Sequence, residues 1–309
     1  MADNYFVVGE EEYLVDAKVK ELIGRHGGDD EWSLERLSSW EELKERLLDM
    51  PMFSESRVFL VEYQELFAGK PDSGQVGELL SSHDNVLIVY TRGKTDKRTG
   101  LYKKLSTCAR LIEVVAPKGQ ALVRWVMERG AELGAARLDS KAAGTLVFLA
   151  GTNMLVLDNE LKKLINYNPE ISVETVQKLA VRDLQASIFT LVDYVVGGQL
   201  AKAQVAAEDM LRTGAEIPYI LFMLGRQYRL LFEYLYYQHQ GYSSGQIQRQ
   251  LSSMHPYAFQ KLRSQAVNLD MKKCASSLQA ILDADYSYKT GRMQGPGLLQ
   301  VLLAKIAKK

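Results

Sequence analysis

The stretch WEELKERLLDMPMFSESRVFLVEY, Trp40–Tyr63, combines the pattern of a helix, a break and the pattern of a strand. Leu43 and Leu47 recur at helical spacing, whereas the unbroken apolar run at 58–61 is typical of a strand buried on both faces. Pro51 ends the helix because it lacks a backbone N–H and disfavours the helical conformation of the residue before it. The stretch therefore predicts two firm elements joined by a short connector.

Met52 and Phe53 are the apolar residues on that connector. Two interpretations of this pair remain open from the residues alone. The first is that both side chains pack back into the core of their own domain, which is what apolar connector residues usually do. The second is a projecting hydrophobic plug that enters a pocket on another protein. Composition by itself favours the first interpretation.

The same alternation of strand and helix extends over the first third of the chain. A helix is expected at Glu10–Ile23 and another at the start of the quoted stretch. The expected strands are Tyr5–Val8, Trp32–Leu37, Arg57–Glu62, Asn85–Thr91 and Leu111–Val115. Parallel strands need crossover connections, which are usually helices, so this rhythm predicts a largely parallel sheet covered by helices. Residues 1–116 are therefore expected to form an α/β domain.

After Ala116-Pro117 the strand signals almost disappear and long helical patterns follow. Glycine pairs and single glycines, such as Gly197-Gly198 and Gly214, mark the turns between them. The expected helices are Trp125–Glu132, Ala142–Ala150, Met154–Tyr167, Val173–Leu179, Ile188–Val196, Leu200–Leu211, Ile217–Gln238, Ser243–Leu251, Tyr257–Asn268, Met271–Tyr288 and Leu298–Ala307. We expect a small helical domain at 117–183 and a larger helical domain at 184–309.

Composition is that of an ordinary globular protein, with 309 residues, 47% apolar and 25% charged. The net charge of zero conceals a gradient: residues 1–116 hold 15 Lys and Arg against 22 Asp and Glu (−7), residues 117–183 hold 9 against 8 (+1), and residues 184–309 hold 14 against 8 (+6). The basic C-terminal part is compatible with nucleic acid nearby, but the charge is dilute and composition alone favours a solvated helical surface. No signal peptide or membrane-spanning run is evident, and the two cysteines are isolated, so we expect a soluble cytoplasmic protein with no membrane contact.

An α/β domain before a helical domain suggests a nucleotide-binding ATPase, which needs a phosphate loop after the first strand. The chain instead reads Gly9-Glu10-Glu11-Glu12 there, and carboxylates without a lysine would repel phosphate. Gly93-Lys94-Thr95 resembles the end of a phosphate loop, but Ile88 stands where the first glycine is required. We interpret 92–98 as a solvated basic loop. No catalytic and no cofactor-binding residues are expected.

Other kinds of site have equally little support in the sequence. His26, His83, His239 and His255 are scattered without ligand spacing, so no metal site is expected. The aromatic cluster around Tyr228 on a long apolar helix is more typical of packing than of base stacking. The chain has a nucleotide-binding architecture without the residues of nucleotide chemistry.

Motifs along nearly the whole chain resemble one family, the delta subunit of the bacterial DNA polymerase III clamp loader. No single motif is diagnostic, and it is their ordered combination that carries the resemblance. The matching pieces are Tyr5–Glu11 with Tyr13-Leu14, Pro51–Ser54 with Arg57, Gly93-Lys94 with Asp96–Thr99, Asn159–Leu164, Ile188-Phe189, Arg226–Leu230, His255–Tyr257 and Lys289–Gly291.

The resemblance implies an ATPase-like (AAA+-like) domain that does not bind ATP, a small helical lid and a helical collar for oligomerisation. It implies a non-catalytic subunit of the DNA polymerase III holoenzyme, active in DNA replication. Its expected partners are the sliding clamp (beta), the gamma or tau and delta prime subunits, and primed DNA. Residue by residue, the clamp-binding plug that opens the ring falls on Met52 and Phe53, where relatives often carry Leu-Phe. Lys289 and Arg292 are candidates for residues near DNA.

Two alternatives belong to other functional classes. One is an ATP-hydrolysing subunit of the same superfamily, against which the Glu10–Glu12 stretch argues. The other is a non-catalytic helical scaffold whose α/β domain binds a small ligand at its strand ends, for which no glycine-rich turn is evident. Thermal shift with the clamp protein and with a nucleotide panel separates these classes.

Overall fold

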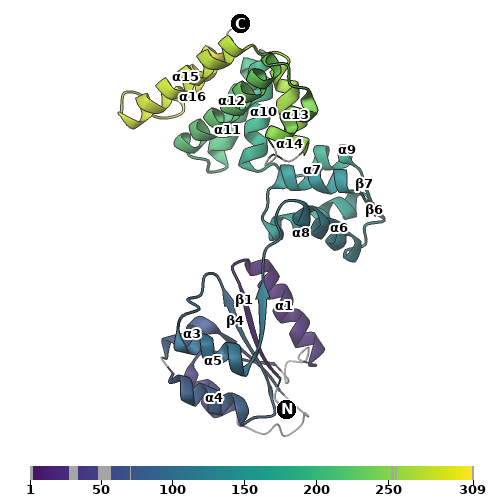
Figure 1. Cartoon of the computed structure of the whole chain (residues 1–309), viewed down its shortest axis with the longest axis vertical. Helices are drawn as coiled ribbons and strands as arrows, with labels where there is room; N and C mark the ends of the chain where they lie inside the picture. Colours follow the sequence, from purple (N-terminus) through teal and green to yellow (C-terminus); the bar gives the residue numbers. More distant parts are fainter. Residues whose placement is uncertain are drawn as a thin grey trace. The chain divides into compact units, whose positions relative to one another are not determined.

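The computed structural model describes residues 3–27, 34–47, 57–69, 71–251, 254 and 256–307. The chain divides into two compact units, Met1–Pro117 and Lys118–Lys309. The first unit holds a parallel sheet with helices, and the second is built almost entirely of helices (Figure 1). The predicted fold class, an α/β part followed by a helical part, is confirmed. The further division of the helical part into a lid and a collar stays a prediction.

The sheet of the first unit has the strand order β2-β3-β4-β1-β5, and every neighbouring pair is parallel. Its strands are β1 (Asn4–Gly9), β2 (Leu34–Leu37), β3 (Val58–Glu62), β4 (Val86–Arg92) and β5 (Arg110–Val114). The helices between them are α1 (Glu12–Arg25), α2 (Trp40–Leu47), α3 (Tyr63–Ala68), α4 (Ser73–Ser81) and α5 (Gly100–Cys108). Each crossover between parallel strands contains a helix, as parallel pairing requires.

Both faces of this sheet are covered by helices. Successive side chains along a strand point to opposite faces, so each strand contributes residues to both. On one face Val7, Val58 and Ile88 pack against α1. On the other, Phe6 and Phe59 pack with buried side chains of α2, α3, α4 and α5. Figure 1 shows α1 on the side of the sheet opposite α3, α4 and α5. This two-sided burial explains why the central strands β1, β3 and β4 are continuous apolar runs, whereas the edge strands β2 and β5 carry charged residues.

In the described residues of the second unit, four helices and two very short strands come first, and seven helices follow. The first group is α6 (Gln120–Glu132), β6 (Arg137–Leu138), α7 (Ser140–Ala150), α8 (Met154–Tyr167), β7 (Glu170–Ile171) and α9 (Val173–Leu179). The second group is α10 (Leu184–Val196), α11 (Leu200–Arg212), α12 (Ile217–His239), α13 (Ser244–Gln250), α14 (Pro256–Ala266), α15 (Met271–Lys289) and α16 (Gly297–Ala307). Among the described residues, none of the helices combines the length and apolarity needed to cross a membrane.

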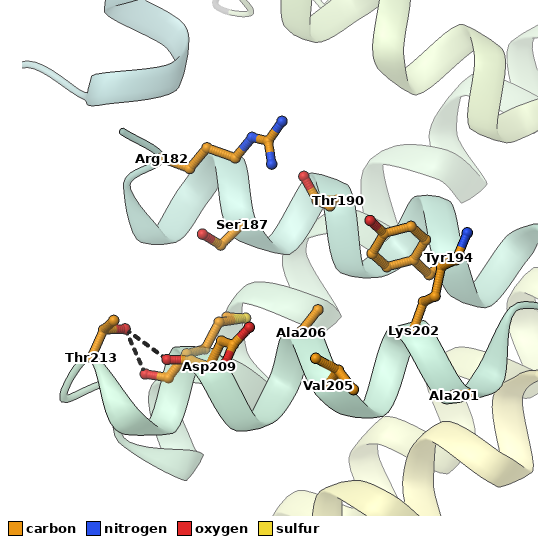
Figure 2. Close-up of a pocket in the computed structure, with 11 residues that line it drawn as sticks. Arg182, Ser187, Thr190, Tyr194, Ala201, Lys202, Val205, Ala206, Asp209 and Thr213 are labelled. Atoms are coloured by element: carbon orange, nitrogen blue, oxygen red, sulfur yellow. Dashed lines mark hydrogen bonds between the residues drawn. The ribbon is translucent and has the colours of Figure 1, made fainter. Parts of the chain in front are cut away.

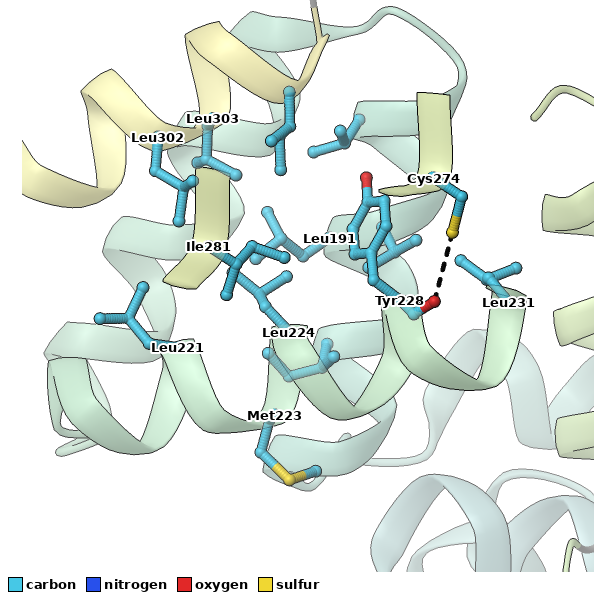
Figure 3. Close-up of a cluster of buried hydrophobic side chains, with 14 of the residues drawn as sticks. Leu191, Leu221, Met223, Leu224, Tyr228, Leu231, Cys274, Ile281, Leu302 and Leu303 are labelled. Carbon is cyan, nitrogen blue, oxygen red and sulfur yellow. Dashed lines mark hydrogen bonds between the residues drawn. The ribbon is translucent and has the colours of Figure 1, made fainter. Parts of the chain in front are cut away.

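The core of the second group is centred on α12, whose Leu224 and Tyr228 pack among buried residues of α10, α15 and α16 (Figure 3). The Cys274 thiol donates a hydrogen bond to the Tyr228 carbonyl oxygen at 3.3 Å. Burial raises the pKa of that thiol to about 12, so it stays protonated and unreactive at neutral pH. Cys274 is therefore a packing residue. In the aromatic cluster, Tyr228 and Tyr234 are buried in the core, Phe232 and Tyr237 are partly buried, and Tyr236 is 47% exposed.

Some elements differ from the sequence-based expectation. Helix α3 follows β3 without a linker and was not expected, and its first residue, Tyr63, is buried against Phe6 and hydrogen-bonded to Thr99 at 3.0 Å. Strands β6 and β7 pair over two residues each and are too short to give a periodic signal. These elements are specified by contacts between distant segments, which local patterns do not reveal.

Candidate functional site

The predicted plug, Met52 and Phe53, lies outside the described residues. Its two flanks are described. Helix α2 is described up to Leu47, with Trp40, Leu43 and Leu47 buried, and Arg57 leads directly into β3. Because every strand of the sheet is parallel, the start of β3 is at the amino edge of the sheet. Ligands of open α/β sheets bind at the opposite, carboxyl edge.

One buried side chain holds both flanks. Asn85, which is 5% exposed, lies immediately before β4. Its Oδ1 accepts a hydrogen bond from the backbone N–H of Arg57 at 3.1 Å, and its Nδ2 donates to the carbonyl oxygen of Leu47 at 2.9 Å. Leu47 of α2 and Arg57, the residue before β3, are thus bonded to the same amide group.

A second contact joins the same flanks from β2. The carboxylate of Glu35 is paired with Arg46, near the end of α2, at 3.0 Å, and with Arg57 at 3.7 Å. These ion pairs are partly solvated, and such pairs usually contribute no more than about 1 kcal/mol. The Asn85 amide is buried, so it is the stronger of the two connections. We call Asn85, Glu35, Leu47 and Arg57 the flank frame.

The carboxyl edge of the sheet is closed to phosphate. Only Glu10 and Glu11 separate β1 from α1, too few residues for a phosphate loop. The carboxylate of Glu11 accepts a hydrogen bond from the backbone N–H of Leu14 at 3.1 Å. The protein therefore supplies its own anion to the helix terminus where a nucleotide phosphate would bind. The expectation that no phosphate loop follows β1 agrees with this geometry.

The Gly93-Lys94-Thr95 motif also lacks the geometry of a phosphate loop. Gly93 has φ +112° and donates its N–H to the carbonyl oxygen of Gly9 at 2.8 Å, which attaches the turn to β1. Arg92, just before it, is paired with Asp16 at 2.9 Å. The hydrogen bond from the Arg92 guanidinium to the Asp16 carboxylate is the main reason that the pKa of Arg92 is raised.

Most cations of the following loop are neutralised within the chain. Lys97 pairs with Glu113 at 2.6 Å, and Arg98 pairs with Asp96 at 3.0 Å. The hydrogen bonds in these two pairs lower the pKa values of both carboxylic acids. Lys94 is exposed. The loop is a paired, solvated surface.

Lys289 and Arg292, the candidates for DNA proximity, are at the end of α15 and just beyond it. Lys289 is paired with Asp285, one turn earlier, at 2.7 Å, and the guanidinium of Arg292 lies 5.2 Å from the ring centroid of Tyr286. Local partners thus account for both side chains. Contact with DNA stays a prediction.

A cavity of about 460 Å³ lies between α10 and α11 (Figure 2). Its serine and threonine hydroxyl groups are engaged by their own helices: Ser187 donates to the carbonyl oxygen of Asp183 at 2.8 Å, Thr190 to that of Ala186 at 3.1 Å, and Thr213 to that of Met210 at 2.9 Å. None of them is paired with a general base. Among the described residues there is also no group of three His, Cys, Asp or Glu side chains that could hold a metal ion.

The sequence patterns predicted a plug at Met52 and Phe53 but gave no sign of the contacts between its flanks. The only local signal of Asn85 is a polar residue directly before a strongly apolar strand, which is also the ordinary pattern of a turn. Glu35 lies on a short strand and carries no motif. Their partners are distant along the chain, so only the folded structure reveals the connection.

These features define a class: an α/β unit with a parallel five-stranded sheet and no phosphate loop after β1, followed by a helical unit. Two models of one family match the chain, "DNA polymerase III, delta subunit" over residues 5–115 and "DNA polymerase III delta subunit, C-terminal domain" over residues 185–306. The chain belongs to the family of DNA polymerase III delta subunits.

Relatives from Bacillus subtilis agree with this assignment. The DNA polymerase III subunit delta of strain 168 is 22% identical over 326 residues, covering 99% of this chain and 93% of the relative. The solved structure of the Bacillus subtilis DNA clamp loader delta protein (YqeN) matches with a TM-score of 0.56 and 21% identity, covering 100% of this chain and 96% of that one. At this identity the structural match supports the fold.

Proposed function

We propose that this delta subunit binds the ring-shaped sliding clamp through Met52 and Phe53 and opens one of its interfaces, so that the clamp can be loaded on primed DNA. The flank frame is the observation that carries this proposal. Asn85 is hydrogen-bonded to both flanks of the segment that holds the pair, at 2.9 and 3.1 Å. A segment with fixed ends loses less conformational entropy when it binds, so a short apolar pair on it can bind a pocket tightly.

Opening follows from differential binding. A ligand shifts an equilibrium only by the difference between its affinities for the two states. A plug that fits the clamp surface better when the neighbouring interface is distorted therefore favours the open ring. Met at position 52 is a flexible apolar side chain that can fill the same kind of pocket as leucine.

The subunit acts without its own nucleotide chemistry. Glu11 caps α1 at the place of a phosphate loop, so ATP binding and hydrolysis belong to partner subunits, which we propose to be gamma or tau together with delta prime. The helical unit at 118–309 would join the subunit to this cytoplasmic assembly, with residues 184–309 as its collar. The Bacillus subtilis relative described as a clamp loader delta protein supports this role.

Calorimetric titration of the full chain with the sliding clamp of the same organism tests the proposal. Met52→Ala combined with Phe53→Ala should weaken binding at least about a hundredfold, because hot-spot residues contribute 2 kcal/mol or more each. Circular dichroism should be unchanged. Wild-type affinity in the double variant would refute the assignment of the plug.

A further inference from the structure

An apolar groove runs between α12 and α15 on the surface of the helical unit, with a volume of about 600 Å³. Its rim carries one large exposed apolar side chain from each helix, Phe222 at 62% exposure and Leu282 at 60%. Tyr219 and Tyr286 are also about half exposed on these helices. Large contiguous apolar surfaces of this kind mark sites of interaction.

The floor of the groove is open because α12 has a glycine where it contacts α15. A Cβ placed on Gly225 would lie 3.7 Å from Cγ2 of Ile281, an ordinary contact distance. An alanine would therefore fit without strain and would favour the helix by about 0.5–1 kcal/mol. The packing of α12 against α15 does not require a glycine at position 225. A depression in the surface does require one, because a side chain there would fill it.

The groove has the length of a helix. Its lining residues extend from Pro218 to Phe232 on α12 and from Ala275 to Lys289 on α15. At 1.5 Å rise per residue, either side spans about 21 Å, or four helical turns. Two neighbouring helices with a depression between them provide the ridges and grooves into which a third helix packs.

The two helices run antiparallel, since Gly225 lies against Ile281 while Tyr228 lies against Cys274. This direction places positive charge in one half of the groove, between Gly225 and Phe232. Arg226 and Arg229 are exposed and line the groove on the side of Ala275. Within the described part of the chain, neither guanidinium has an ion pair or a hydrogen bond.

The opposite end of the groove is electrically balanced, because Lys289 is paired there with Asp285 at 2.7 Å. The occupant therefore meets positive charge at one end and a neutral pair at the other. Guanidinium groups of this kind select carboxylates.

We infer that the α12–α15 groove binds an amphipathic α-helix of a neighbouring subunit in the assembly, with two carboxylates one turn apart at the end that faces Arg226 and Arg229. Apolar residues of this helix cover Phe222 and Leu282. The inference rests on the proposed function in one respect, which is that the partner belongs to the same assembly. The groove lies on the helical unit, whereas the clamp contact is on the α/β unit.

Photo-cross-linking in the clamp-loader complex, reconstituted from the organism's own subunits, tests the inference. Phe222→p-benzoylphenylalanine and Leu282→p-benzoylphenylalanine should both cross-link to one segment of another subunit. That segment should have acidic residues at i, i+3 or i, i+4 spacing. Cross-links to DNA, to the clamp, to a second copy of this chain or to a segment without such carboxylates would overturn the inference, as would the absence of any cross-link.

Charge reversal provides the second measurement. Arg226→Glu with Arg229→Glu should weaken incorporation into the complex at least about tenfold, because like charges then face each other. Arg249→Glu with Arg263→Glu, exposed on α13 and α14, makes the same charge change outside the groove and should leave incorporation unchanged. Equal incorporation of both variants would overturn the inference.

Titration of each isolated variant with the clamp separates this inference from the proposed function. The groove variants should bind the clamp as the wild-type chain does. If the wild-type chain itself does not bind, the proposed function fails, whatever the cross-links show.

Discussion

At the scale of single residues, two polar side chains of the α/β unit stabilise its own helices and strands. Glu11 fills the helix terminus where phosphate would bind, and Asn85 uses its amide to connect α2 with the start of β3. The absence of a phosphate loop after β1 was predictable, because Glu10 to Glu12 exclude it by charge alone. The role of Asn85 was not predictable, because both of its hydrogen-bond partners are distant in sequence.

Asn85→Ala should lower both the stability of the chain and its affinity for the clamp. The change leaves the Arg57 N–H and the Leu47 carbonyl oxygen without a partner, which costs about 1–3 kcal/mol for each buried group. Loosened flanks should also weaken clamp binding by about tenfold, since 1.4 kcal/mol corresponds to that factor. Calorimetry well below the unfolding temperature measures the affinity. Asp84→Ala, an exposed neighbour, is the matched control.

A synthetic peptide of residues 47–57 separates positioning from folding. The wild-type chain should bind the clamp more tightly than the peptide, and the Asn85→Ala chain should approach the affinity of the peptide. If Asn85→Ala lowers stability while clamp affinity stays at the wild-type value, the amide serves only the fold.

At the scale of elements, the sequence patterns predicted what depends on local periodicity. Strand β4 and the long helices α12 and α15 follow from their apolar spacing. Helix α3 and the two-residue pairing of β6 with β7 could not be predicted, because they depend on tertiary contacts. The same applies to a polar network that connects α10, α12 and α14.

That network is centred on Gln265. Its Nε2 donates to the carbonyl oxygen of Phe189 at 2.9 Å and to Oδ1 of Asp193 at 2.7 Å. Its Oε1 accepts a hydrogen bond from Nε2 of Gln227, also at 2.7 Å. Three helices therefore depend on one buried amide.

Gln265→Leu should destabilise the chain by about 2–4 kcal/mol, because several buried groups lose their partner together. Urea unfolding followed by circular dichroism measures this change. Ser264→Ala, whose hydroxyl is exposed, should change stability by no more than about 0.5 kcal/mol. Equal effects of the two variants would show that the network contributes nothing specific.

At the scale of the whole molecule, the proposed function and the inferred groove assign different tasks to the two compact units. The plug and its frame are in the first unit, and the groove between α12 and α15 is in the second. The fragment 1–117 should therefore fold alone and bind the clamp within about threefold of the full chain, a difference below 1 kcal/mol. Circular dichroism and calorimetry of the fragment check this. A folded fragment without clamp affinity would mean that the helical unit takes part in the contact.

The most direct test of the central claim is whether the plug opens the ring. A pair of fluorophores placed across one clamp interface reports the distance between its two sides. Addition of the wild-type chain without nucleotide should lower energy transfer, and Met52→Ala with Phe53→Ala should leave it at the value of the free clamp. Unchanged transfer with saturating wild-type chain, or equal opening by the double variant, would contradict the account.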